Sequence, residues 1–312
     1  MMKIVIVGPG AMGCLFAAFF AKKKQAEVWV LDKDARRAKR LRDSGITIEG
    51  TSGSFKVKVD ITARPQDIKA CDLVILCVKS YDTETAVKTI GPFLGQDSNV
   101  LTLQNGLGNI EMISEIVGRD RVVGGITSHG ATLISEGHTY HAGTGDTIIG
   151  RIDGTFTVAM RHIREVMNRA GISTRLTKDV NGVIWSKLII NAGINALTAI
   201  TRLPNGRLIE LPETREIVSM AVTEAVRVAK KKRIKLIYDD PIQKVESVCR
   251  ATEQNLSSML QDLMKKKRTE IDFINGAIVR QAKSLNIPSP ANTILADLVK
   301  TMEQGYAPEK TA

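Results

Sequence analysis

The stretch Lys3-Ile4-Val5-Ile6-Val7-Gly8-Pro9-Gly10-Ala11-Met12-Gly13 decides the fold of the amino-terminal half of the chain. Its β-branched run predicts a strand, and the apolar residues that follow the glycines predict a helix. In this setting a G-x-G-x-x-G pattern binds a dinucleotide: Gly8 makes the tight turn, Gly10 lets the backbone approach a pyrophosphate, and Gly13 lets the helix pack closely on the strand. The predicted cofactor-binding residues of this loop are Gly8, Pro9, Gly10, Ala11, Met12 and Gly13.

The end of the second predicted strand, 27–31, carries residues that bear on the choice of nucleotide. Asp32 stands about 20 residues beyond the glycines, where an acid accepts the ribose hydroxyls of NAD. Lys33, Arg36 and Arg37 follow at once, and a cation at this turn is what the 2′-phosphate of NADP needs. The ordinary alternative for these charges is a solvated first helical turn. From these residues alone, NADP and NAD both stay open.

Two later strands end in polar residues. The runs 72–78 and 100–104 are mostly apolar, as strands buried on both faces are, and they lead into Lys79 and Asn105. Because ligands of open parallel sheets lie beyond the carboxyl ends of the strands, we expect Lys79 and Asn105 at the same crevice as the glycine loop. Between these strands and the first two, a Gly-Thr-Ser-Gly turn predicts a β-hairpin.

The second half of the chain has a different pattern. At 312 residues the chain is longer than one core usually grows, so we expect two domains. Sheet-like patterning stops near Lys178, and the later segments have helical period, among them 185–200, 213–232, 239–265 and 269–285, with a last helix after Pro290. The predicted fold is α/β, with a Rossmann-type doubly wound sheet in residues 1–178 and an all-α substrate domain in residues 179–312.

The first of these helices carries a polar stripe. Lys187, Asn191 and Asn195 follow at i, i+4 and i+8, so one cation and two amides share a face of an otherwise apolar helix. Such a stripe is costly to bury unless something binds it, which favours a small-molecule site. The alternative is a satisfied polar seam between packed helices.

Composition argues against several other classes of protein. The balance of 44 Lys and Arg against 33 Asp and Glu gives a net charge of +11, but with 4% aromatic residues and no nucleic-acid module we expect no nucleic-acid partner. The apolar run 4–21 is broken by glycine and followed by lysines, so we expect neither export nor a membrane span. Four cysteines without metal or Cys-x-x-Cys spacing predict a reduced, cytoplasmic protein. We expect no metal, because the spacings of His129, His138 and His141 match no ligand motif.

Four motifs taken together resemble the ketopantoate reductase (2-dehydropantoate 2-reductase) family over nearly the whole chain. They are residues 8–13, residues 104–108, Trp185-Ser186-Lys187 with Asn191 and Asn195, and residues 255–262 with 268–276. The resemblance implies reduction of the C2 ketone of ketopantoate to pantoate, with Lys187 as the catalytic acid and Glu270 beside substrate and cofactor. It implies substrate contacts from Asn105, Asn191, Asn195, Asn205 and Ser258, and cofactor contacts from Asn105, Ala131 and Glu270.

Two departures from the family pattern concern the cofactor. Lys79-Ser80-Tyr81-Asp82 stands where the family commonly has Lys-x-x-Gln. Asp32 stands where members that use NADP usually lack an acid, while Lys33 falls at about the place of their phosphate-binding arginine. We expect NADP, with NAD possible because of Asp32.

The residues suit the chemistry that the resemblance implies. A lysine has an ordinary pKa near 10.4, so Lys187 is charged at neutral pH and can polarise a ketone oxygen and protonate it. The amides of Asn191 and Asn195 and the hydroxyl of Ser258 can hold the substrate without adding negative charge that would repel its carboxylate. Glu270 can orient the lysine or accept from the substrate hydroxyl, or it can merely pair with a helix dipole. The alternatives are another hydroxyacid dehydrogenase of this architecture or a non-catalytic nucleotide sensor. The expected partner is a small 2-keto acid, and homodimer formation stays open.

Overall fold

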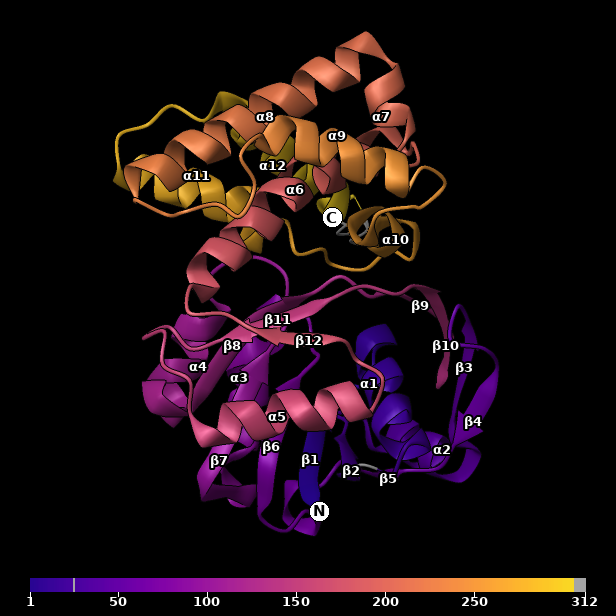
Figure 1. The fold of residues 1–312 in the computed structure, drawn as a ribbon. Helices are drawn as coiled ribbons and strands as arrows, with labels where there is room; N and C mark the ends of the chain where they lie inside the picture. The colour runs from indigo at the N-terminus through magenta and orange to yellow at the C-terminus, as the bar shows by residue number, and fades with distance from the viewer. Residues whose placement is uncertain (25, 306–312) are drawn as a thin grey trace, which may run out of the picture. The chain divides into compact units, whose positions relative to one another are not determined.

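The computed structural model describes residues 1–24 and 26–305, and it divides into two compact units (Figure 1). Met1–Gln104 and Asn109–Val180 form the first, which we call the sheet unit. Asn105–Gly108 and the chain from Asn181 onward form the second, which we call the helical unit. Residues 306–312 of the predicted second domain lie outside the described residues.

The sheet unit is built on an eight-stranded sheet with the order β12-β11-β8-β7-β6-β1-β2-β5. The strands from β5 to β8 run parallel, and β11 turns antiparallel to β8. The chain moves one way from β1 to β2 and then returns to β6 on the other side of β1, which makes the carboxyl end of β1 a topological switch point. The strands are β1 (Met2–Val7), β2 (Ala26–Leu31), β5 (Asp60–Thr62), β6 (Cys71–Leu76), β7 (Leu94–Thr102), β8 (Val122–Thr127), β11 (Thr147–Gly150) and β12 (Thr174–Leu176).

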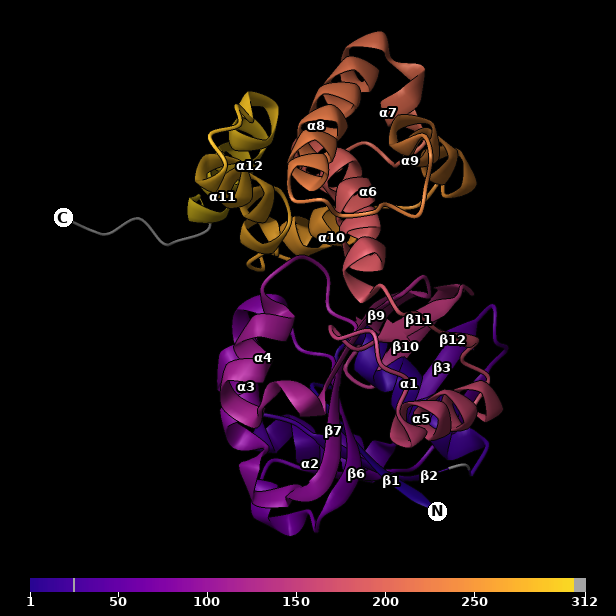
Figure 2. The ribbon, with the colours of Figure 1, turned by 60° about the vertical axis from the view of Figure 1, so that its left-hand side comes forward.

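Helices cover both faces of this sheet, which confirms the predicted α/β class. In Figure 2, α3 and α4 lie on one side of β6 and β7, and α5 lies on the other. The central strands are buried on both faces because helices shield each side, as their apolar sequences predict. The helices are α1 (Ala11–Lys22), α2 (Ala35–Ser44), α3 (Thr83–Thr89), α4 (Asn109–Val117) and α5 (Val158–Arg169), with short 3-10 turns at Pro65–Asp67, Ser80–Asp82, Gly91–Phe93 and Arg119–Arg121.

A second, four-stranded sheet packs on α1. Its order is β4-β3-β10-β9, and the predicted hairpin is its antiparallel β3-β4 pair. The β10 strand pairs parallel to β3 from about 90 residues further along the chain, a pairing that no local turn signal indicates. Apolar residues from both sheets and from α1 share one core. These strands are β3 (Ile46–Gly50), β4 (Phe55–Val57), β9 (Gly130–Ser135) and β10 (His138–Gly143).

The helical unit is arranged around α6, the helix that carries the polar stripe. Figure 2 shows α6 among the other helices of this unit. Gly193 allows the close contact, because a Cβ there would lie 2.9 Å from a methyl group of Val222 in α8 and 3.3 Å from one of Val245 in α9. The helices are α6 (Val180–Thr201), α7 (Arg207–Glu210), α8 (Pro212–Lys231), α9 (Pro241–Ala251), α10 (Ser258–Met264), α11 (Asn275–Ser284) and α12 (Pro290–Gln304), with a 3-10 turn at Ile271–Phe273.

The length and hydropathy of α6 also satisfy the criteria for a helix that crosses a membrane. However, 72% of its most apolar window is buried inside the structure, as in a core helix. Its apolar residues belong to the core that α8, α9, α11 and α12 also build.

Two segments of helical period are interrupted in the structure. The segment 239–265 divides into α9 and α10 because residues 252–257 leave the helix, and the carbonyls of Glu253 and Asn255 accept hydrogen bonds from Gly206 and Asn205 instead. The segment 269–285 begins with a 3-10 turn, and the carbonyl of Phe273 accepts from the N–H of Leu107. Both interruptions therefore come from hydrogen bonds to distant parts of the chain.

Candidate functional site

The glycine loop has the backbone geometry that its sequence predicts. Gly8 has a φ of +97°, a conformation that favours glycine, and its N–H donates to the carbonyl of Leu31 in β2. A Cβ on Gly13 would lie 2.1 Å from the Gly8 carbonyl oxygen, so only glycine lets α1 pack so closely. At Gly10 the nearest atom to an added Cβ is the Cys77 carbonyl oxygen, 3.9 Å away. The loop is therefore tight at Gly8 and Gly13 and open at Gly10.

The amino terminus of α1 provides hydrogen-bond donors for an anion. Gly10 caps the helix without a side chain, and no side-chain hydrogen bond caps it. The first N–H groups of a helix have no partner within the helix and carry positive potential, which suits phosphate groups. The uncapped helix, with open space at Gly10, fits the pyrophosphate of a dinucleotide.

Asp32, at the end of β2, is buried and paired. It is 1% exposed, and its two oxygens accept from the guanidinium of Arg37, at 2.6 Å from Nε and 2.5 Å from Nη2. The N–H of Asp34 also donates to this carboxylate at 3.1 Å. The carboxylate raises the pKa of Arg37, and the pair joins β2 to the first turn of α2. The acceptor capacity that a ribose would need at Asp32 is thus largely taken by Arg37.

Lys33 contacts a different acid, Asp82. Its Nζ lies 2.9 Å from Oδ2 of Asp82, which belongs to the 3-10 turn after β6. Lys79 precedes the same turn, and its backbone carbonyl accepts from the N–H of Asp82 at 2.8 Å. The structure thus places Lys33 and Lys79 at the carboxyl ends of β2 and β6, on either side of β1.

Ala131 lies apart from these residues in the chain, on β9 of the small sheet. It pairs with His141 of β10 and packs against the core that α1 also contributes to. Near it, Nδ1 of His129 lies 3.0 Å from Nε2 of His141, and burial lowers the pKa of both histidines, that of His129 to about 4. Both rings are therefore neutral near pH 7. Within residues 1–24 and 26–305, no three potential metal ligands come together.

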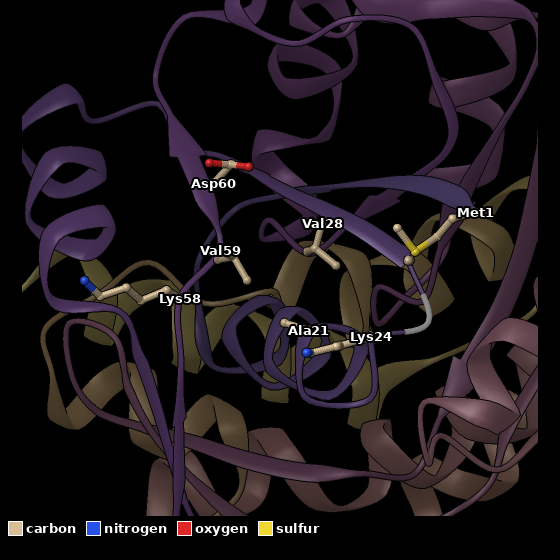
Figure 3. Close-up of a pocket in the computed structure, with 8 residues that line it drawn as sticks. Met1, Ala21, Lys24, Val28, Lys58, Val59 and Asp60 are labelled. Atoms are coloured by element: carbon tan, nitrogen blue, oxygen red, sulfur yellow. The ribbon is translucent and has the colours of Figure 1, made fainter.

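The sheet unit also has an open hollow of about 310 Å³, which lies away from the glycine loop. Figure 3 shows Val28 among the residues that line it. Ala26 and Val28 lie at the amino end of β2, whereas the glycine loop follows the carboxyl end of the parallel β1. The hollow is therefore at the wrong edge of the sheet for a nucleotide. Its lining residues are Met1, Ala21, Lys24, Ala26, Val28, Lys58, Val59 and Asp60.

In the helical unit, Lys187 lies partly buried on α6. Burial lowers its pKa from 10.5 to about 8, and the negative charge of Glu270 offsets part of that shift. Glu270 itself is buried and stands just before the 3-10 turn at Ile271–Phe273. A lysine with a pKa near 8 is mostly charged at neutral pH and still gives up a proton readily. Lys187 and Glu270 thus form an interacting pair of opposite charges.

The segment Asn105–Gly108 lies on the helical unit beside this pair. The Nδ2 of Asn191 is 3.5 Å from Oδ1 of Asn105, and the N–H of Leu107 donates to the carbonyl of Phe273 at 2.9 Å. Gly106, with a φ of +89°, is required here because a Cβ would meet the same carbonyl at 2.3 Å. Asn105 and Asn191 are therefore brought together, and Leu107 is bonded to Phe273, three residues beyond Glu270 in the chain.

The backbone around Glu270 is held by its neighbours. The N–H of Thr269 donates to a carboxylate oxygen of Glu303 in α12 at 2.6 Å, and the N–H of Ile271 donates to the hydroxyl of Thr269 at 3.1 Å. These bonds fix the chain on both sides of Glu270. The sequence gives no local signal of the contact with Glu303, because this residue lies 34 positions beyond Thr269.

The remaining substrate candidates differ in their surroundings. Asn195 is buried one helical turn beyond Asn191. Ser258 is exposed at the start of α10, and its neighbour Ser257 caps that helix and bonds the Thr198 hydroxyl of α6 at 2.7 Å. Asn205 is buried, and its Nδ2 donates to Thr252 at 2.9 Å. The structure ties α10 to α6 through Ser257, to which the sequence alone assigns no role. It also bonds Asn205 to the segment after α9.

A buried polar network holds the middle of α6. The Nδ2 of Asn275 donates to the carbonyl of Ala192 at 3.0 Å and lies 3.1 Å from Oδ1 of Asn292. Glu224 accepts from the N–H groups of Ala291 and Asn292 at the start of α12. Because Ala192 lies between Asn191 and Asn195, the network fixes the part of α6 that carries the stripe.

Comparison with known protein families gives matches along nearly the whole chain. The family model described as ketopantoate reductase PanE/ApbA matches residues 4–154, and the model of its C-terminal part matches residues 179–303. The 2-dehydropantoate 2-reductase of Halobacterium salinarum is 35% identical over 97% of this chain and 99% of its own length. That of Pyrococcus horikoshii is 36% identical over 97% of this chain and 98% of its own.

Solved structures show the same architecture. A PanE/ApbA family ketopantoate reductase from Ralstonia eutropha has a TM-score of 0.90 at 32% identity, and the match covers 98% of this chain and 99% of that one. A ternary structure of D-mandelate dehydrogenase with NADH and anilino(oxo)acetate has a TM-score of 0.92 at 26% identity, with 98% of this chain and 99% of that chain covered.

Proposed function

Since the chain belongs to the ketopantoate reductase family, we infer that it reduces the C2 ketone of ketopantoate to the hydroxyl of pantoate, as an oxidoreductase that uses NADPH. The inference rests on one observation: both family models match this chain, and its relatives align with it over nearly their whole length. The reaction belongs to pantothenate biosynthesis. The expected partner is thus a small 2-keto acid, and we propose a cytoplasmic location.

Lys187 is proposed as the proton donor. Its pKa of about 8 leaves about nine in ten of these lysines protonated at pH 7. The ammonium group can polarise the ketone oxygen and protonate it as negative charge develops there, so one residue supplies electrostatic stabilisation and the acid. NADPH, when bound, supplies the hydride to the ketone carbon. Lys187 then regains its proton from water.

Glu270 is proposed to keep Lys187 protonated and to hold its side chain in position. Its negative charge raises the pKa of Lys187 against the effect of burial. Without it, a buried lysine would be neutral more of the time and could not act as an acid. The fixed backbone around Glu270 suits this role, because the carboxylate must keep its position through the reaction.

The substrate is proposed to lie against the amide groups of the stripe. Asn105, Asn191 and Asn195 can bond the carboxylate and hydroxyl groups of the substrate without adding like charge. Ser258 and Asn205 are proposed to contribute from the start of α10 and from the segment after α6. The network at Ala192 supports the stripe by fixing α6.

For the nucleotide, the glycine loop and the uncapped start of α1 are proposed to hold the pyrophosphate. Lys33 and Lys79 are proposed to face the adenosine end, and Ala131 and Asn105 to contact the cofactor. The pairing of Asp32 with Arg37 favours NADPH, because it takes up the acid that would bind the ribose hydroxyls of NADH.

A second candidate is the reduction of a different 2-keto acid. It is favoured by the likeness to D-mandelate dehydrogenase, whose structure holds NADH with anilino(oxo)acetate. The same lysine chemistry would serve that reaction. The difference would lie in which side chain on C2 the site accepts.

Initial rates of NADPH oxidation test the proposal. Ketopantoate, phenylglyoxylate and pyruvate are compared as substrates, each with NADPH and with NADH. We expect ketopantoate with NADPH to give the highest kcat/KM. A higher kcat/KM with phenylglyoxylate would favour the second candidate, and no turnover with any of the acids would refute both.

A further inference from the structure

An ion pair spans the carboxyl end of β1, where the glycine loop begins. Lys33 follows β2 and Asp82 follows β6, and these two strands flank β1 in the sheet. The 2.9 Å contact between Nζ and Oδ2 therefore crosses the switch point of the sheet. In folds of this kind, the residues just after the second strand face the 2′-position of the adenosine ribose.

The two partners of this pair are held very differently. The hydroxyl of Thr83, next to Asp82, is buried between the side chains of Asn109 and Gln104, at 3.0 and 2.8 Å. Gln104 also donates to the carbonyl of Val78, so the turn is fastened on both sides of Asp82. The Lys33 side chain, by contrast, is 75% exposed. The backbone that carries Asp82 is therefore held in place, and the exposed Lys33 side chain is the partner that can move.

Arg37 and the start of α2 are already engaged by acids at this turn. Arg37 is engaged by Asp32 through two short hydrogen bonds. The carboxylate of Asp34 accepts from the N–H groups of Arg36 and Arg37 and so caps α2. An anion is therefore drawn to Lys33 more readily than to Arg37 or to the start of α2.

We propose that Asp82 sets the preference between NADPH and NADH, by competing with the 2′-phosphate for Lys33. The proposal rests on the nucleotide binding inferred above and goes further, by assigning a discriminating role to an acid outside the expected cofactor contacts. Asp82 acts through Lys33 and is a positioning residue.

The effect follows from charge. A phosphate monoester carries between one and two negative charges near neutral pH, and an exposed ion pair is weak, so the phosphate displaces Asp82 from Lys33. Because the turn that carries Asp82 is held in place, its carboxylate then remains near the phosphate as a like charge. NADH has a hydroxyl at this position and leaves the Lys33–Asp82 pair intact. Asp82 thus weakens NADPH binding and leaves NADH binding unchanged.

Nucleotide dissociation constants of Asp82→Asn, measured by fluorescence titration without substrate, test the proposal. We expect NADPH to bind about three- to tenfold more tightly than to the unaltered protein, with less than about a twofold change for NADH, and we expect the gain to shrink at high salt. Glu84→Gln is the matched control, because Glu84 is an exposed acid two residues away that pairs with Lys88. It removes the same charge and should leave the NADPH to NADH ratio unchanged.

Lys33→Gln completes a double-mutant cycle. Lys33→Gln alone should weaken NADPH binding. In the double variant, Asp82→Asn should raise the NADPH affinity by less than it does when Lys33 is present. An equal change for both nucleotides in Asp82→Asn, or the same gain with Gln at position 33, would overturn the role of Asp82 while leaving the reductase proposal standing. If the unaltered protein bound neither nucleotide, both proposals would fail.

Discussion

The candidate sites of the sheet unit and of the helical unit are built by different means. In the sheet unit the nucleotide loop is made of backbone. Its shape depends on the absence of side chains at Gly8 and Gly13, and Gly10 leaves open space for a ligand. In the helical unit the site is made of side chains, brought together from 105–108, from α6 and from the chain around Glu270. The first is a local structure and the second depends on tertiary packing.

This difference sets what each region tolerates. A loop made of backbone loses its conformation when a single Cβ is added at a position where it would clash, as at Gly8 or Gly13. A side-chain site keeps its fold when one polar group is trimmed, because its helices are held by apolar packing and by the Asn275 network. It then loses the chemistry that the group supplied.

The largest effect is expected from Lys187. Lys187→Ala removes the proposed acid and should lower kcat by about 10²- to 10⁴-fold, while the dissociation constant for NADPH stays within about twofold of its original value. Single-turnover rates and fluorescence titration separate the two quantities. Lys187→Arg is the matched variant, since it keeps the positive charge but has a pKa too high to donate a proton, and it should remain slow.

If the alanine variant kept a near-original rate, Lys187 could not be the acid. If it lost nucleotide binding as strongly as turnover, the division of labour between the two regions would be wrong.

A smaller effect is expected from the glycine loop, where two positions should respond in opposite ways. Gly10→Ala meets open space and should leave thermal stability within about 0.5 kcal/mol, yet it should weaken NADPH binding by about tenfold, because the Cβ occupies the approach to the pyrophosphate. Gly13→Ala drives a Cβ into the Gly8 carbonyl and should destabilise the fold by about 1–3 kcal/mol.

Thermal unfolding of the two variants, together with NADPH titration, measures the contrast. Equal losses of stability at both positions would mean that Gly10 serves packing rather than ligand approach.

The sequence predicted the local features well. The glycine loop, the parallel strands and the hairpin follow from residues within a short window, and the α/β class is confirmed. The division of 239–265 into α9 and α10 could not be predicted, because hydrogen bonds from Asn205 and Gly206 to the carbonyls of Asn255 and Glu253 hold the break. Nor does a local pattern indicate that β10 pairs with β3.

The partners of the site residues were harder to predict than the residues themselves. The sequence places Asp32 where an acid accepts the ribose hydroxyls, and the structure pairs it with Arg37. The sequence assigns no role to Asp82, and the structure pairs it with Lys33, 49 residues away in the chain. Such pairings depend on which strand ends become neighbours. The proposed roles of Lys187, Glu270 and the substrate residues remain predictions.

The smallest effect is a shift in pH dependence. It tests most directly the central claim that Lys187 is the acid and that Glu270 keeps it protonated. Lys187 must be protonated to act as the acid, so kcat/KM for ketopantoate should be level below about pH 8 and fall above it, because the pKa of Lys187 is about 8. Glu270→Gln removes the charge that raises this pKa, so the falling limb should move to lower pH. The measurement is the pH profile of both proteins with saturating NADPH. A rate that stays level to about pH 10, near the ordinary pKa of lysine, or a limb that does not move in Glu270→Gln, would contradict the account.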